Sequence, residues 1–207
     1  MTLINILTRT GNRESYYKTL KNSIDTQTYD YMRHIKSSDN PSCEFLRYEK
    51  DVFEVERDES QGVGFYNEYL NVLGTKVKEG WVIILDDDSK LIDSNFIKNL
   101  AKECSKSSAN EILIFRSYLS PQKIAFPPKQ EWKNKSIAKC RIDMSCFCAH
   151  HTVLNKFKFD GRLCGDFNFL LKLMESNMFK FKFVDITPIG IWANYDGAKL
   201  GKNLQQI

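Results

Sequence analysis

The sequence has no long hydrophobic run and little proline or glycine. Of its 207 residues only 5 are proline and 10 are glycine, whereas 42% are hydrophobic and 13% are aromatic. This balance excludes a low-complexity disordered chain, because the sequence is rich in side chains that pack against one another. No apolar stretch approaches the roughly 20 residues that a membrane-spanning helix needs. We therefore expect one globular domain over residues 1–207 with no transmembrane segment.

The sequence also lacks a strong excess of charge of one sign. Its 30 Lys and Arg residues are interleaved with 26 acidic residues, and the formal net charge is +4 at pH 7. A dedicated nucleic-acid binder concentrates its basic residues, so this pattern argues against a nucleic-acid partner. Arg9 interrupts the start of the chain, where a signal peptide would need a continuous apolar stretch. We expect a soluble, cytoplasmic protein.

The cysteines do not form a recognisable framework. A chain of this length can bury a full core without disulfides, so we expect reduced thiols. The six are Cys43, Cys104, Cys140, Cys146, Cys148 and Cys164. A structural zinc site using the later cysteines with His150 and His151 is disfavoured, because there is no second Cys-x-x-Cys pair and the residues alternate as in a strand.

Short apolar runs and helical spacings alternate along the chain. We expect strands at residues 3–8, 32–37, 52–55, 81–85, 112–115, 142–149 and 179–184. We expect helices at residues 15–24, 65–73, 94–104 and 166–174, with Gly74 ending the second and Ser94 capping the third. Residues 120–139 are predicted to be irregular and residues 194–203 to form a mobile basic tail. Alternating strands and helices predict a mostly parallel central sheet flanked by helices, an α/β fold.

Three consecutive aspartates, Asp86-Asp87-Asp88, follow the most apolar predicted strand. In open α/β sheets, ligands bind beyond the carboxyl ends of the strands. Adjacent carboxylates repel one another unless a cation lies between them, and their hard oxygen atoms suit Mg²⁺ or Mn²⁺. The sequence therefore indicates a metal site that binds a diphosphate, with a solvated acidic turn or a helix-capping cluster as the alternative.

Several segments resemble, in order, the family 2 glycosyltransferases of the GT-A fold. The turn from Thr8 to Arg13 is similar to the one after the family's first strand, with Arg9 and Gly11 in place of its Pro and Tyr. The aspartate triplet matches the family's Asp-x-Asp (DXD) signature. Gly165-Asp166 is similar to the family's Glu-Asp pair at a helix start, with Gly165 in place of Glu. The resemblance spans roughly residues 3–190.

This resemblance implies a single GT-A domain with a nucleotide-sugar half, about residues 1–89, and an acceptor half, about residues 90–207. The implied activity is metal-dependent transfer of a hexosyl group from a nucleotide-diphosphate sugar to an acceptor hydroxyl, with inversion, in glycan biosynthesis. A UDP-sugar is the first expectation for the donor, with GDP- and dTDP-sugars as alternatives. The acceptor is a glycan or glycoconjugate, and the cofactor is Mn²⁺ or Mg²⁺.

The resemblance also implies roles for individual residues. The expected nucleotide-sugar-binding residues are Thr8, Thr10, Arg13, Asp39, Asn67, Asp86 and Asp87. Asp88 is the expected main metal ligand, with Asp86 beside it. Asp166 is the expected base that deprotonates the acceptor hydroxyl, with Asp143 in reserve, and an ordinary helix N-cap is the alternative role of Asp166.

Three further residues are candidates for the acceptor site or a lid. His151 is expected to border the acceptor, Trp192 to stack on a sugar ring and Lys199 to close over the diphosphate. Core packing is the alternative for Trp192, and a solvated tail is the alternative for Lys199.

Two rival functions stay open. A metal-dependent phosphatase can carry a similar Asp-x-Asp, but there the motif ends the first strand, whereas here about three predicted strands precede it. A non-catalytic nucleotide- or sugar-binding module of a larger polypeptide is the other rival, which the substitution at Gly165 keeps open. A sugar nucleotidyltransferase is less consistent with the sequence, because residues 8–13 lack a glycine-rich phosphate loop.

Overall fold

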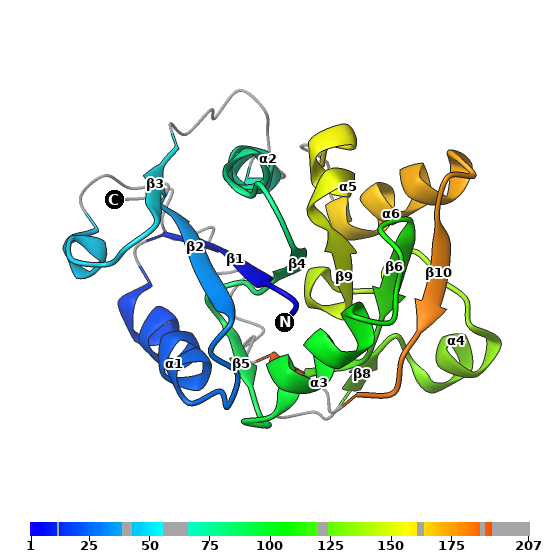
Figure 1. Cartoon of the computed structure of the whole chain (residues 1–207), viewed down its shortest axis with the longest axis horizontal. Coiled ribbons are helices and arrows are strands. Elements are labelled where there is room, and N and C mark those ends of the chain that lie inside the picture. Colours follow the sequence, from blue (N-terminus) through cyan, green and yellow to red (C-terminus); the bar gives the residue numbers. More distant parts are fainter. Residues whose placement is uncertain are drawn as a thin grey trace.

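The fold is a mixed α/β domain built on two sheets (Figure 1). The computed structural model describes residues 1–11, 13–38, 43–55, 66–119, 124–160, 164–186 and 189–191. The strands are β1 (Ile4–Thr10), β2 (Met32–Ser38), β3 (Val52–Glu54), β4 (Trp81–Ile84), β5 (Ser89–Leu91), β6 (Glu111–Ile114), β7 (Ser117–Leu119), β8 (Ile124–Phe126), β9 (Phe147–His150), β10 (Lys180–Phe183) and β11 (Ile189–Ile191). The helices are α1 (Glu14–Asp25), α2 (Tyr66–Lys76), α3 (Phe96–Cys104), α4 (Lys129–Asn134), α5 (His151–Lys156) and α6 (Gly165–Glu175), with 3-10 turns η1 (Glu44–Leu46) and η3 (Met144–Cys146).

The larger sheet has seven strands in the order β10-β6-β9-β4-β1-β2-β3. All neighbouring strands in it are parallel except β9, which runs antiparallel to both β4 and β6. The smaller sheet has the order β5-β11-β7-β8. The prediction of a mostly parallel central sheet flanked by helices is confirmed.

The central strands are apolar throughout because both faces of the large sheet are covered. Val82 and Ile84 of β4 pack in the cluster that contains α2, α5 and α6 side chains. Trp81 and Ile83, which alternate with them, pack in the cluster that contains α1 and α3 side chains. Successive strand residues point to opposite faces, so a strand buried on both faces has no polar alternation. This explains why the most apolar run of the sequence lies at the centre of the sheet.

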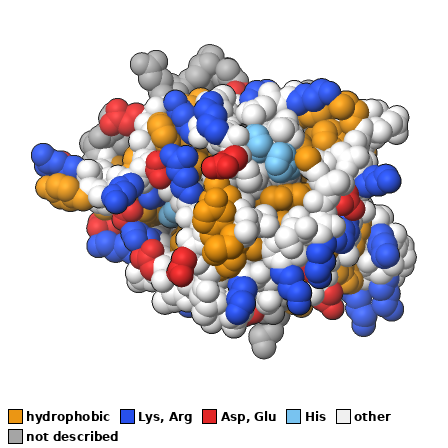
Figure 2. Space-filling model, in the orientation of Figure 1, with side chains coloured by type: hydrophobic (Ala, Val, Ile, Leu, Met, Phe, Trp, Pro, Cys, Tyr) orange, Lys and Arg blue, Asp and Glu red, His pale blue; other side chains and the backbone are white. Residues whose placement is uncertain are grey.

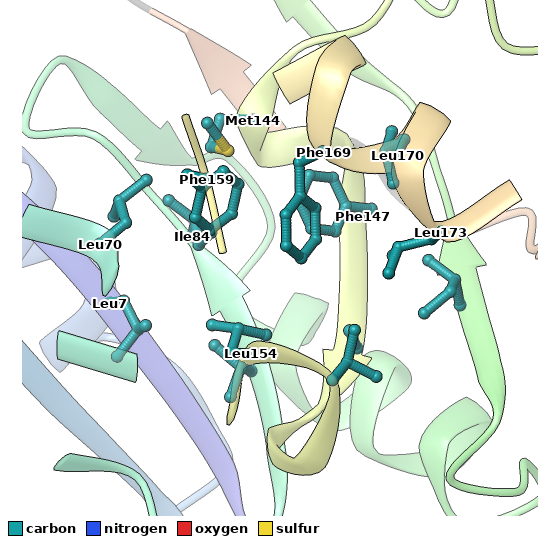
Figure 3. Close-up of a cluster of buried hydrophobic side chains, with 14 of the residues drawn as sticks. Leu7, Leu70, Ile84, Met144, Phe147, Leu154, Phe159, Phe169, Leu170 and Leu173 are labelled. Carbon is teal, nitrogen blue, oxygen red and sulfur yellow. The ribbon is translucent and has the colours of Figure 1, made fainter. Parts of the chain in front are cut away.

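Helix α6 is held on the sheet by stacked phenylalanine rings (Figure 3). Phe169 of α6 stacks on Phe147 of β9 with ring centroids 5.8 Å apart, and on Phe159 at 4.0 Å. Truncating a fully buried phenylalanine to alanine typically costs about 3–5 kcal/mol. This packing fixes the first turn of α6, which carries Asp166, relative to the sheet.

Most predicted elements are present, with boundaries that differ by a few residues. The predicted strand 142–149 begins only at Phe147, because η3 occupies the preceding residues. The four short elements β5, β7, β11 and α5 were not predicted, since three to six residues are too few to show a periodic pattern.

Three local predictions are wrong. Gly74 does not end α2, which continues to Lys76; a Cβ at Gly74 would lie 3.3 Å from Leu154 Cβ, so the glycine lets α2 approach α5 closely. Ser94 does not cap α3, since Asn95 is the N-cap residue and its side chain makes no capping hydrogen bond. Residues 120–139 are not irregular throughout, because they contain β8 and α4. The predicted tail at residues 194–203 lies outside the described residues.

The charged side chains are dispersed on the surface (Figure 2), and the cysteines are not joined by disulfides. Figure 2 shows Lys and Arg side chains spread over this face rather than gathered in one area. All six cysteines are free. Within the described ranges, no helix has the length and apolar character required to cross a bilayer.

Candidate functional site

The topology brings three distant segments to one edge of the large sheet. Strands β1 and β4 are parallel and in register, with Leu7 opposite Ile84, so the residues that follow each strand emerge at the same edge. Strand β9 runs the other way and starts at this edge, with Phe147 opposite Ile114 of β6. Asp143, four residues before β9 begins, is therefore brought towards the aspartates that follow β4.

Asp86 is held by an arginine from the neighbouring strand. Arg9 donates from Nε to Asp86 Oδ1 at 2.7 Å and from Nη2 to Oδ2 at 2.8 Å, a bidentate ion pair. The third nitrogen, Nη1, donates to Asn67 Oδ1 of α2 at 2.8 Å. The planar guanidinium matches the carboxylate fork, so this arrangement fixes the orientation of the Asp86 side chain.

Asp87 is buried and paired on the other side of the turn. Its Oδ2 accepts from Thr10 Oγ1 at 2.7 Å and from Arg13 Nε at 3.0 Å, and Arg13 Nη2 donates to Oδ1. Asp88 is different: among the described residues its carboxylate makes no hydrogen bond, and its nearest cationic group is Arg13 Nη1 at 3.6 Å. Of the three consecutive aspartates, Asp88 thus has the carboxylate most available to a ligand.

Asp143 and Asp166 complete the acidic group without an arginine of their own. Asp143 Oδ1 accepts from the backbone N–H of Ser145 at 2.8 Å and from its Oγ at 2.6 Å. Asp166 Oδ1 accepts from the backbone N–H of Phe167 at 2.7 Å, in the first turn of α6. No Lys or Arg nitrogen of the described chain lies within 4.0 Å of either carboxylate.

Burial and mutual repulsion raise the pKa values of this group. Burial raises the pKa of Asp88 to about 6, and the neighbouring Asp86 adds to the rise while Arg13 opposes it. Burial likewise raises the pKa of Asp143 to about 6, against the hydrogen bonds from Ser145, and the charges of Asp166 and Asp86 raise it further. Burial also raises the pKa of Asp166. The negative charges of these carboxylates raise one another's pKa values, as is usual for carboxylates that share one site.

The site has more carboxylates than guanidinium groups, and this imbalance suits a divalent cation. Both oxygens of Asp86 accept from Arg9, and Asp87 accepts from Arg13 and Thr10. Asp88 keeps its oxygens, and Asp143 keeps Oδ2, free of hydrogen bonds within the described chain. Mg²⁺ and similar ions are commonly bound by one or two carboxylates together with substrate phosphates. The donor set fits that mode, although no group of three or more metal-binding side chains occurs among the described residues.

The space around Gly165 is filled by a neighbouring side chain. A Cβ at Gly165 would lie 2.2 Å from Asn67 Nδ2, so a larger residue would require the Asn67 amide to move. Asn67 occupies this space because it bonds Arg9 on one side and donates to the backbone oxygen of Asp160 at 2.9 Å on the other. The substitution at Gly165 therefore goes together with the Arg9 and Asn67 pair.

The structure brings together most, but not all, of the predicted site residues. It gathers Thr10, Arg13, Asn67, Asp86, Asp87, Asp88, Asp143 and Asp166 at this edge. Thr8 is buried beside them within β1, where its Oγ1 lies 2.9 Å from His34 Nε2. His151 is not brought there: its N–H donates to the backbone oxygen of Gly80, before β4 begins, at the opposite edge of the sheet. Asp39, Trp192 and Lys199 lie outside the described residues.

Two alternatives from the sequence are not supported by the geometry. Asp166 is not the N-cap of α6, because Cys164 occupies that position and the helix begins at Gly165. The residues of the zinc site, which the sequence already disfavoured, are dispersed, since Cys146 and Cys148 are buried in different clusters while Cys140 is exposed.

Sequence reasoning missed Arg9 and Ser145 as parts of the site. Arg9 appeared only as a departure from the family's proline, although its place at the end of the first strand was a usable signal. Ser145 gave no signal, because its contact with Asp143 depends on the 3-10 turn that forms before β9.

Among known proteins, matches to this chain are found at the level of three-dimensional structure. No protein-family profile matches the sequence. No curated protein matches it at a significant level. Solved structures do match in fold, and the similar ones reported next are glycosyltransferases.

One similar structure is S. aureus TarS 1-349, with a TM-score of 0.71 and 15% identity over 99% of this chain. The same protein in complex with UDP-GlcNAc gives a TM-score of 0.65 with 16% identity over 92% of this chain and 58% of that one. The mannosyltransferase PcManGT from Pyrobaculum calidifontis, in complex with GDP-Man and Mn²⁺, gives 0.64 with 12% identity over 90% of this chain and 56% of that one. The present chain spans 64% of the TarS 1-349 structure and 37% of a longer TarS structure. These matches establish the GT-A-like architecture.

Proposed function

We propose that this protein is a glycosyltransferase that moves a sugar from a nucleotide-diphosphate sugar to an acceptor hydroxyl. The observation that carries the proposal is the gathering of Asp86, Asp88, Asp143 and Asp166 at the carboxyl edge of β1 and β4, with negative charge in excess. The structures of similar fold include complexes with UDP-GlcNAc and with GDP-Man and Mn²⁺, which supports a nucleotide sugar as the donor.

The donor is proposed to lie across the ends of β1 and β4. Arg9 orients Asp86, and Arg13 with Thr10 orients Asp87, so both carboxylates are preorganised before a ligand arrives. A fixed carboxylate such as Asp86 can accept hydrogen bonds from ribose hydroxyls without reorganising. We assign Asp39 to the same nucleotide-binding group on the family resemblance alone.

A divalent cation, Mn²⁺ or Mg²⁺, would be held by Asp88. When bound, such an ion neutralises the charge that develops on the departing diphosphate. Asp86 contributes to the negative potential that attracts the ion, while Arg9 holds its oxygens.

Asp166 is the proposed base that accepts the proton of the acceptor hydroxyl, which corresponds to an inverting displacement. Its Oδ1 is held by the Phe167 N–H, which leaves Oδ2 to receive a proton. The raised pKa of Asp166 brings it closer to the working pH, where a general base is most effective. Asp143, held in the same way by Ser145, is the alternative base.

The direct test is release of nucleoside diphosphate from UDP-GlcNAc, GDP-mannose and a dTDP-sugar, each with Mn²⁺ and with EDTA. Thermal shift run in parallel measures binding, because a ligand of the folded state raises the apparent melting temperature. We expect one donor to stabilise the protein and to be turned over, with water serving as a slow acceptor.

Other results would reject the proposal in distinguishable ways. Release of inorganic phosphate from simple phosphomonoesters, without use of any nucleotide sugar, would indicate a phosphatase. Stabilisation by a nucleotide sugar without turnover in the presence of glycan acceptors would indicate a binding module.

A further inference from the structure

Outside the acidic site, the structure places two accessible thiols next to each other. The Sγ atoms of Cys140 and Cys164 lie 3.4 Å apart although the residues are 24 positions apart in the chain. Cys140 is exposed and Cys164 is partly exposed. A disulfide bond is about 2.0 Å long, so the two sulfur atoms need to approach by little more than an ångström.

The backbone at both cysteines is unusual. Cys140 has a φ of 58° and Cys164 a φ of 60°, in the left-handed region that side-chain-bearing residues rarely adopt. Such conformations are unfavourable for residues other than glycine and persist where the surrounding structure maintains them. Here the two conformations turn both thiols towards the same point.

A second pair of close thiols in the same molecule serves as an internal comparison. Cys104 and Cys148 have their Sγ atoms 3.9 Å apart, but both residues are buried in the core between the large sheet and α3. A small reagent reaches the first pair and not the second. In both pairs the sulfur atoms lie close together, but only Cys140 and Cys164 are accessible to solvent.

We propose that Cys140 and Cys164 form a thiol–disulfide exchange site, which reacts with small disulfides such as oxidised glutathione and closes into an intrachain disulfide. The Cys140 thiolate attacks one sulfur of the glutathione disulfide, whose S–S bond breaks and releases one glutathione thiolate. The Cys164 thiolate then attacks the Cys140 sulfur of the mixed disulfide and releases the second glutathione. The protein loses two electrons and two protons, and both are recovered in two molecules of reduced glutathione.

Cys140 is assigned the first attack because it is the more exposed of the two. Cys164 is assigned the second step, because the adjacent Cys140 sulfur raises the pKa of its thiol and makes it the poorer initial nucleophile. The bond formed would tie the segment before Asp143 to the N-cap of α6, two residues before Asp166. Thiol exchange at these two cysteines does not require the proposed transferase activity.

The test treats the purified, reduced protein with oxidised glutathione and follows intact mass and the number of rapidly alkylated thiols. The wild type is expected to lose two rapidly reacting thiols and the mass of two hydrogens, with no glutathione retained, and peptide mapping is expected to join Cys140 to Cys164. Cys164→Ser is expected to stop at the first step and to retain one glutathione on Cys140. Cys43→Ser, which removes a buried thiol, is the matched control and is expected to behave as the wild type.

The oxidised protein is also expected to melt at a higher temperature and to exchange the amides at the start of α6 more slowly, since the cross-link closes a long loop. A stable glutathione adduct on wild-type Cys140, or two thiols that stay reduced under oxidant while they react rapidly with an alkylating reagent, would overturn the proposal. The intact-mass and alkylation measurements need no substrate, so their failure is distinct from a failure of the proposed function.

Discussion

The acidic edge of the sheet has two sides that use the same side chain in different ways. On the β4 side, Asp86 and Asp87 are each matched by an arginine from the β1 segment. On the α6 side, Asp143 and Asp166 are held by serine and backbone N–H groups, and no Lys or Arg nitrogen of the described chain lies within 4.0 Å of them.

This difference separates binding from proton transfer. A carboxylate locked in an ion pair has a fixed orientation, which suits recognition of a ligand, although burial raises the pKa of the paired Asp87 to about 7 against the charge of Arg13. Burial raises the pKa values of Asp143 and Asp166 with no Lys or Arg nitrogen of the described chain close to them, which suits acid–base chemistry. The following predictions change one side at a time.

The largest effect is expected at the α6 side. Asp166→Asn keeps the shape of the side chain but cannot take a proton, so we expect turnover to fall by about two orders of magnitude or more while donor affinity stays near the wild-type value. Steady-state rates and thermal shift with the donor measure the two quantities separately. Asp143→Asn is the matched variant; a larger loss there than at Asp166 would exchange the roles of the two carboxylates.

On the β4 side, removing Arg13, the counter-ion of Asp87, should destabilise the protein. The Asp87 side chain is 0% exposed, so Arg13→Met leaves an unpaired buried charge and is expected to destabilise the protein by about 3 kcal/mol. Chemical denaturation measures the change. Arg13→Met combined with Asp87→Asn should recover part of the loss, and a double variant as unstable as Arg13→Met alone would contradict the ion-pair interpretation.

Asp88 lies between the two sides and should affect metal-dependent binding alone. Asp88→Asn is expected to reduce the Mn²⁺-dependent part of donor affinity about tenfold or more, with little change in stability, because this carboxylate makes no hydrogen bond within the described chain. Titrating the donor with and without Mn²⁺ gives the two affinities. Equal effects of Mn²⁺ on the variant and the wild type would remove Asp88 from the metal site.

The smallest effect on function is expected at His34, whose Nε2 lies 2.9 Å from Thr8 Oγ1. Burial, together with the charges of Lys36 and Lys21, lowers the pKa of His34 to about 3, while Asp51 opposes the shift. Between this value and the ordinary pKa of about 6.5, the unfolded chain binds the proton and the folded chain does not, so stability falls as the pH decreases through that range.

We expect the lowered pKa of His34 to reduce the free energy of unfolding by about 2 kcal/mol at pH 5 relative to pH 7. His34→Gln retains a hydrogen bond to Thr8 and should flatten this part of the pH dependence, as measured by denaturation at several pH values. An unchanged slope in the variant would show that another group is responsible.

Much of the fold was predictable because its signals are local and strong. The apolar run at residues 81–85 predicted a strand buried on both faces, and β4 lies at the centre of the large sheet with cluster residues on each side. The short strands of the small sheet were not predictable, because their three residues show no period and because β11 joins β5 and β7, which are distant from it in the chain.

The candidate site was likewise predictable only in part. The aspartate triplet was visible in the sequence because its members are adjacent. The partners of these aspartates were less visible, because Arg9 lies 77 positions from Asp86 and meets it only when β1 and β4 pair.

By itself, the sequence determined the order of strands and helices along most of the chain and the chemistry at the end of β4, since both follow from the hydrophobic pattern and from adjacent charges. Only the tertiary structure decided that β9 runs against its neighbours and so delivers Asp143 to the edge of Asp86–Asp88 while carrying His151 to the opposite one. The physical reason is that strand direction is set by pairing and by packing on both faces of the sheet, and no residue pattern within β9 itself encodes which end meets the site.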